Sequence, residues 1–87
     1  MPLTIKRESI TTGDEISAFI EIGNRKDGRS LLARVELFGG SDDGYTVRFE
    51  DFYTGSASSG LRLTSMAEAM EELEGMADGF IRHYSQP

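Results

Sequence analysis

The sequence predicts an α+β fold in which one C-terminal helix covers one face of a four-stranded antiparallel sheet, in the order ββββα. Four stretches alternate apolar and polar residues with a period of two, which is typical of strands. The segments between them are short and rich in Gly, Asn and Asp, which favours turns. Near the C-terminus the apolar residues recur every three or four positions instead, which is the period of an amphipathic helix.

The predicted strands cover residues 3–10, 15–22, 31–38 and 45–52. All four are rich in β-branched and aromatic side chains, which suit a half-buried pleated surface. The second strand has the strictest alternation, with its apolar side formed by Ile16, Ala18, Ile20 and Ile22. The connecting segments are 12–14, 23–28 and 39–44. None is long enough for a crossover helix, so we expect an antiparallel meander. Residues 61–63 are a candidate for a short additional strand.

A helix is predicted after Ser65, because Ser65 and Glu68 have the spacing of a capping box. The apolar stripe that follows contains Met66, Met70, Leu73, Ala77, Phe80 and Tyr84. Gly75 and Gly79 interrupt this stripe, and each costs about 1 kcal/mol relative to Ala inside a helix. The sequence leaves open whether the helix continues through both glycines, kinks there, or ends at one of them.

The 87 residues predict one domain, spanning 1–87, with one hydrophobic core. The expected core consists of Ile5, Ile16, Ala18, Ile20, Ile22, Val35, Leu37, Val47, Phe49, Met70, Leu73, Ala77 and Phe80.

Composition limits the classes of function. Fifteen acidic against nine basic residues give a net charge of -6, which disfavours direct nucleic-acid binding. The chain has no Cys and one His, His83, so thiol catalysis, zinc–thiolate sites and nucleophile–base pairs lack their residues. We therefore expect a non-enzymatic protein with no cofactor and no metal. No apolar stretch is long enough to span a membrane and no secretory signal is evident, so the expected location is the cytoplasm.

Two surfaces are candidates for binding a protein partner. On the sheet face that the helix leaves open, the alternation places Phe19, Leu32, Arg34 and Phe38. Large apolar side chains with charged neighbours are typical of a protein interface, unless loops or the tail cover them. The helix adds a strip of carboxylates that includes Glu71, Glu72 and Asp78. This strip is either a docking surface for a basic partner or an ordinary solvated face.

In its size, acidity, lack of Cys and expected architecture, the chain resembles small phage-encoded anti-CRISPR proteins. That resemblance implies an inhibitor that occludes a nucleic-acid-handling partner, such as a CRISPR effector complex. From the two surfaces described above, we expect Phe19, Phe38 and Arg34 to make the contacts. Glu71, Glu72 and Asp78 would steer the chain towards a basic surface.

A second resemblance covers about half of the chain. The strand from Ala33, the segment Asp43-Gly44-Tyr45-Thr46-Val47-Arg48-Phe49 and the helix opening with Glu68-Ala69 are similar to the antitoxin of HicA/HicB toxin–antitoxin pairs. It implies the alternative function, an antitoxin or small regulatory domain that neutralises a basic toxin. A homodimer, formed through the open sheet face or the edge of the first strand, is a further alternative.

Overall fold

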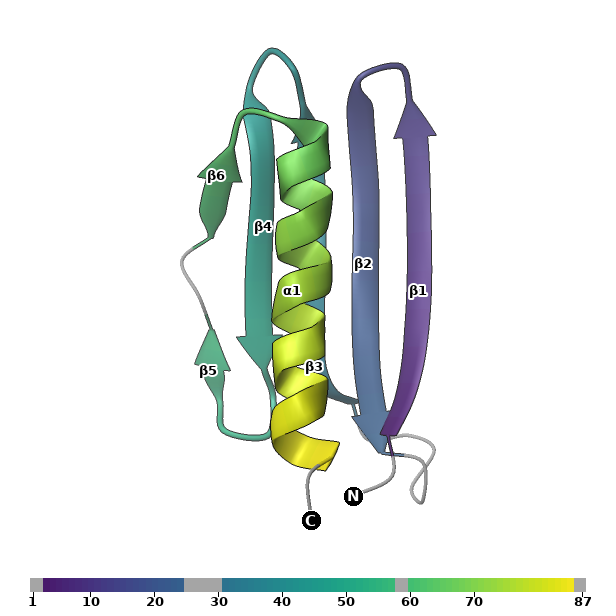
Figure 1. Cartoon of the computed structure of the whole chain (residues 1–87), viewed down its shortest axis with the longest axis vertical. Coiled ribbons are helices and arrows are strands. Elements are labelled where there is room, and N and C mark those ends of the chain that lie inside the picture. Colours follow the sequence, from purple (N-terminus) through teal and green to yellow (C-terminus); the bar gives the residue numbers. More distant parts are fainter. Residues whose placement is uncertain (1–2, 25–30, 58–59, 86–87) are drawn as a thin grey trace.

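The computed structural model describes residues 3–24, 31–57 and 60–85, which form one sheet and one helix (Figure 1). The elements are β1 (Leu3–Thr12), β2 (Glu15–Asn24), β3 (Leu31–Gly40), β4 (Gly44–Asp51), β5 (Ser56–Ala57), β6 (Leu61–Leu63) and α1 (Met66–Ser85). The strand order is β1-β2-β3-β4-β5, with β6 also paired to β4, and every pairing is antiparallel. The α+β class and the antiparallel meander are confirmed. The basic residues between β2 and β3, which are Arg25, Lys26 and Arg29, lie outside the described residues.

The predicted count of four strands is too low, because the described residues contain six. Both additional strands lie along the outer edge of β4, where β5 pairs with Glu50 and Asp51 and β6 pairs with residues 45–47. Their backbone groups satisfy those of β4. A strand of two or three residues is too short to show an alternating pattern, and the sequence suggested only 61–63.

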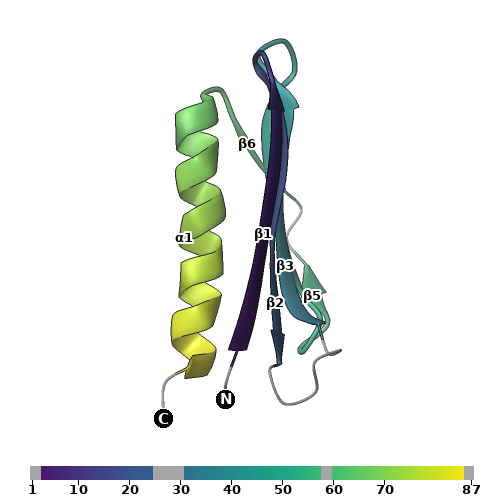
Figure 2. The same ribbon diagram turned by 90° about the vertical axis from the view of Figure 1, so that its right-hand side faces the viewer.

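One helix covers one face of the sheet, and α1 runs parallel to the strands over β2, β3 and β4 (Figures 1 and 2). The core lies between these two layers. Its buried apolar residues are Ile16, Ala18, Ile20, Ile22, Leu32, Ala33, Val35, Leu37, Tyr45, Val47, Ala69, Leu73, Ala77 and Phe80. Phe49 and Met70, predicted to be buried, are partly buried at its margin.

Ile5 departs furthest from the predicted core, because 46% of its surface is exposed. It stands opposite Ile22 in the β1–β2 pairing, and Ile22 is fully buried. Since α1 packs on β2 to β4, the side chains of β1 lie beyond the area that the helix covers.

The helix is continuous through Gly75 and Gly79, which settles the point that the sequence left open. Ser65 caps its first turn: the Glu68 N–H donates to Ser65 Oγ at 3.4 Å, and the Ala69 N–H donates to the Ser65 carbonyl at 3.0 Å. No heavy atom would lie within 4 Å of a Cβ at either glycine, so neither is required by close packing.

At one position near the end of β3, the backbone conformation requires glycine. Gly39 has φ +136°, and a Cβ there would lie 2.2 Å from the Gly44 carbonyl oxygen. The β3–β4 hairpin is therefore closed by a backbone contact that no other residue type allows.

Candidate functional site

The open face of the sheet carries two rows of mostly charged side chains, and within these rows positive and negative residues lie side by side. The first row runs across four strands and alternates in sign, with members Lys6, Glu21, Arg34 and Glu50. The second row is its neighbour and contains Glu8, Phe19, Glu36 and Arg48. Opposite charges that face each other across strands stabilise a sheet and cancel most of its field. The centre of the open face is therefore close to neutral.

Arg34 holds this network together. Its Nη1 donates to Glu21 Oε2 at 2.9 Å, and its Nε lies 3.0 Å from Glu36 Oε1. The guanidinium carbon also lies 4.3 Å from the centre of the Phe19 ring, in a cation–π arrangement. Two of the predicted contact residues, Phe19 and Arg34, thus already bind each other.

The predicted apolar residues of this face do not form one continuous patch. Leu32 is buried at a register shift, where Ile22 and Gly23 pair with Ala33 and Leu31 and leave Leu32 without an opposite residue in β2. Phe38 is 42% exposed, but it is six residues further along β3, which corresponds to about 20 Å of strand.

Phe38 has a different apolar neighbour. The register aligns Ile10, Ser17 and Phe38 in one row, so two exposed apolar side chains flank a small serine. Ile10 is 72% exposed, the largest value among the large apolar side chains that the structure describes. This apolar pair lies towards the end of the sheet that carries the β1–β2 and β3–β4 turns (Figure 1).

The carboxylates of α1 separate into two groups. Glu74 accepts from Arg7 of β1 at 2.5 Å, and Asp78 accepts from Arg82 one turn later at 2.5 Å. Among the described residues, Glu68, Glu71 and Glu72 form no ion pair. Of the predicted steering residues, Asp78 is therefore paired with a neighbour, whereas Glu71 and Glu72 have no ion-pair partner among the described residues.

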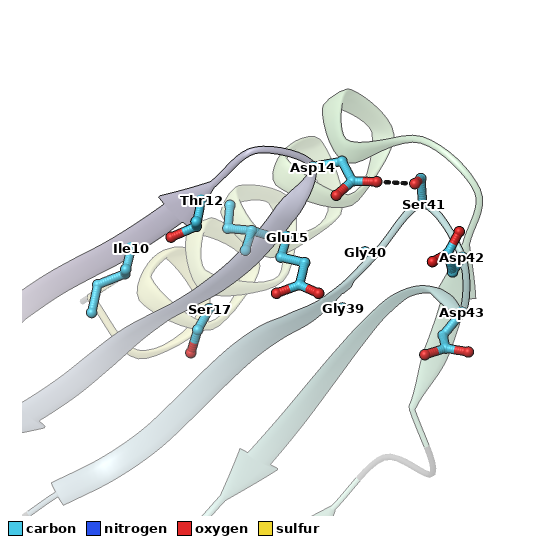
Figure 3. A pocket seen from close by; sticks show the side chains of 11 residues that line it. Ile10, Thr12, Asp14, Glu15, Ser17, Gly39, Gly40, Ser41, Asp42 and Asp43 are labelled. Atoms are coloured by element: carbon cyan, nitrogen blue, oxygen red, sulfur yellow. Dashed lines mark hydrogen bonds between the residues drawn. The ribbon is translucent and has the colours of Figure 1, made fainter.

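More carboxylates gather where the two hairpins meet. A pocket of about 400 Å³ opens between the β1–β2 and β3–β4 turns, and Figure 3 shows Asp14, Glu15, Asp42 and Asp43 around it. The turns are joined by two contacts: Ser41 Oγ donates to Asp14 Oδ2, and the Tyr45 hydroxyl donates to the Asp14 carbonyl at 2.7 Å. The bonded residues are 27 and 31 positions apart in sequence, so these bonds hold the β1–β2 turn against the β3–β4 hairpin.

The first two turns of α1 lie at the same end of the molecule as these hairpin turns (Figures 1 and 2). We refer to this end of the molecule as the acidic end, and its carboxylates are Asp14, Glu15, Asp42, Asp43, Glu68, Glu71 and Glu72. Among the residues that the structure describes, Arg62 is the cation placed here, and it donates to the Asp43 carbonyl oxygen. The sequence suggested the helical members, but the turn carboxylates join them through tertiary structure.

A second pocket, of about 460 Å³, lies between α1 and β4, with Gly75, Gly79 and Phe49 in its wall. Tyr84 borders it and packs on Phe80, with ring centres 4.4 Å apart. Burial raises the pKa of the Tyr84 hydroxyl, and the nearby Asp51 and Tyr53 add smaller effects in the same direction. Asp51 uses its carboxylate locally, where Oδ1 accepts the backbone N–H groups of Tyr53 and Thr54.

Within residues 3–24, 31–57 and 60–85, no three side chains of His, Cys, Asp or Glu are arranged to hold a metal ion. His83 is exposed and its ring contacts Tyr84, with ring centres 4.7 Å apart. No helix in this part of the chain is long and apolar enough to cross a membrane.

No protein-family model matches the sequence, and searches among curated proteins and among solved structures found no match. The properties of the acidic end and of the open face are therefore the basis for an assignment of function.

Proposed function

We propose that this chain is a non-enzymatic protein-binding inhibitor that uses its acidic end to cover a basic surface of a nucleic-acid-handling protein. The observation that carries the proposal is the concentration of seven carboxylates, from two hairpin turns and the start of α1, at one end of an elongated molecule measuring 41 × 21 × 19 Å. A CRISPR effector complex is one partner of this chemistry.

Electrostatics favours the acidic end over the centre of the open face. A charged side chain that is already paired within its own chain attracts a partner only weakly. Arg34 is paired in this way, because it contacts Glu21, Glu36 and Phe19. Glu68, Glu71 and Glu72 form no ion pair within the described part of the chain. Unpaired surface carboxylates attract a basic partner over about one Debye length and accelerate its association.

Apolar contact area is available beside the acidic end. Ile10 and Phe38 are exposed next to the hairpin turns, and Ile10 also borders the acidic pocket. Exposed apolar side chains beside charged ones are common in protein–protein interfaces. Phe38 therefore remains in the proposed contact surface as an anchor, whereas Phe19 and Arg34 maintain the sheet face.

The test is capture of partners by the immobilised chain from nuclease-treated lysate of the source cell, at low and high salt. We expect a basic nucleic-acid-binding protein that is released by salt, because exposed charges are screened. The purified partner should then lose binding to its nucleic acid when the chain is added. Capture of a small basic toxin instead would support the antitoxin-like alternative.

Two variants with the same change in net charge separate the surfaces. Glu71→Gln with Glu72→Gln removes two charges from the acidic end, and we expect about tenfold weaker binding. Glu36→Gln with Glu50→Gln removes two charges from the open face and should leave affinity within about twofold. Equal losses in both variants, or a partner whose nucleic-acid binding is unaffected, would contradict the proposal.

A further inference from the structure

Of the four long strands of the sheet, β1 is the most exposed. Nine of its ten residues are exposed, and the remaining one, Leu3, is half-buried. It pairs with β2 along its whole length, while α1 packs on β2, β3 and β4 and leaves β1 beside the helix rather than beneath it (Figure 1).

The two edges of the sheet differ in whether further strands pair with them. At one edge, β5 and β6 pair with β4 and occupy most of its outer backbone groups. At the other edge, none of the described residues pairs with the outer side of β1. The β1–β2 register is continuous from Leu3 to Thr12, and β1 contains neither a bulge nor a Pro. A long, regular edge of this kind is a template for another strand.

We propose that β1 pairs antiparallel with β1 of a second copy, around a two-fold axis that passes through Arg7, so that one sheet continues through both copies. The register follows from charge. A two-fold axis that joins antiparallel edge strands is perpendicular to the sheet, so it places one residue opposite its own copy and its neighbours opposite each other.

Three consecutive charged residues, Lys6, Arg7 and Glu8, lie near the middle of β1. An axis through Lys6 or Glu8 would bring two like charges together, and neither residue has an ion-pair partner in the described part of its own chain. An axis through Arg7 places Lys6 opposite Glu8 of the other copy, and does so twice. The two Arg7 side chains that meet are each neutralised by Glu74 of their own chain at 2.5 Å.

This arrangement places both helices on the same face of the joined sheet and the two acidic ends at opposite ends of the dimer. It does not depend on the proposed function. Stable interfaces bury about 1,200–2,000 Å², more than one strand edge supplies, so self-association should be weak and dependent on concentration.

A single cysteine tests the register directly, because the chain has no Cys of its own. Residues directly opposite in an antiparallel pair have Cα atoms about 4.5–5.5 Å apart, which is within the range that a disulfide spans. We expect Arg7→Cys to form a covalent dimer under mild oxidation. Ser9→Cys is the matched control on the same face of β1, and should remain monomeric on a non-reducing gel because it faces Ile5 of the other copy. Cross-linking of Ser9→Cys as fast as Arg7→Cys, or of neither, would overturn the register.

A charge exchange tests the association without a covalent bond. Sedimentation velocity over a range of concentrations should show a dimer for the wild-type chain. Lys6→Glu and Glu8→Lys should each raise the dissociation constant about tenfold, because each creates two like-charge pairs. The double variant should restore dimerisation. A wild-type chain that is monomeric at every concentration, or a double variant as weak as the single ones, would refute the proposal.

Discussion

The neighbouring strands β1 and β2 show how little strand pairing alone buries. They are paired residue for residue from Leu3–Asn24 to Thr12–Glu15, yet β2 contributes four buried apolar side chains and β1 contributes none. Ile5 and Ile22 face each other on the same side of the sheet, and their exposed fractions are 46% and 0%. Hydrogen bonds between strands satisfy the backbone, whereas burial of side chains requires the second layer, α1.

The largest expected effect comes from truncating Ile22, and truncation of Ile5 provides the contrast. Ile22→Ala should lower the free energy of unfolding by about 2–5 kcal/mol, because it removes a fully buried side chain and leaves a cavity. Ile5→Ala should cost less than about 1 kcal/mol, since much of that side chain already contacts water. Urea denaturation of both variants measures the difference. Similar losses would mean that β1 is covered by something besides α1.

The next effect concerns the helix that provides the cover. Gly75→Ala and Gly79→Ala should each stabilise the protein by about 0.5–1 kcal/mol, because both positions are helical and a Cβ has open space there. Gly39→Ala is the contrasting control and should destabilise it, because its φ of +136° and the nearby Gly44 carbonyl exclude a side chain. The midpoint of urea unfolding reports all three. A helical substitution that destabilises would show that the pocket beside α1 needs its glycines.

A smaller effect is expected from the one described ion pair that connects β1 to α1. Arg7 and Glu74 have half-exposed side chains, 51% each, so their interaction should contribute about 0.2–1 kcal/mol. A double-mutant cycle with Arg7→Ala and Glu74→Ala measures the coupling, which should shrink in high salt. A coupling well above this range would make β1 a more integral part of the core than its exposure indicates.

The smallest effect is a pH dependence at the far end of α1. The pKa of Tyr84 is raised from its ordinary value of 10.0, so the folded state holds this proton more tightly than the unfolded state. The stability that results is complete below pH 10 and is lost as pH rises through the folded-state pKa. Comparison of wild type with Tyr84→Phe over alkaline pH isolates this component. Parallel curves for the two proteins would contradict it.

Most of the architecture was predictable because it depends on local patterns. The period of two in β2 and the apolar stripe of α1 each reflect neighbours within one element, and Ser65 caps the helix where the capping box indicated. Of the two short strands, β6 was only a candidate and β5 was not predicted, since strands of two and three residues are too short to show an alternating pattern. Leu32 is buried at a register shift that alternation cannot reveal.

The candidate site was predictable only in part. Glu71 and Glu72 follow from their spacing on one helix, as does the ion pair between Asp78 and Arg82 four residues later. The pairing of Phe19 with Arg34 needed the β2–β3 register, and the gathering of Asp14 with Asp42 and Asp43 needed the two hairpins side by side. These residues are far apart in sequence, so no local pattern relates them.

The sequence by itself determined which segments become strands and helix and which side of each segment is apolar, because side-chain periodicity is a property of a single element. The tertiary structure decided which apolar sides are buried and which charges remain without a partner. It did so because α1 is wide enough to cover β2, β3 and β4 but not β1, and because the hairpin turns lie at the same end of the molecule as the start of α1. Burial and charge compensation are properties of surfaces assembled from distant segments, and they exist only after those segments have packed together.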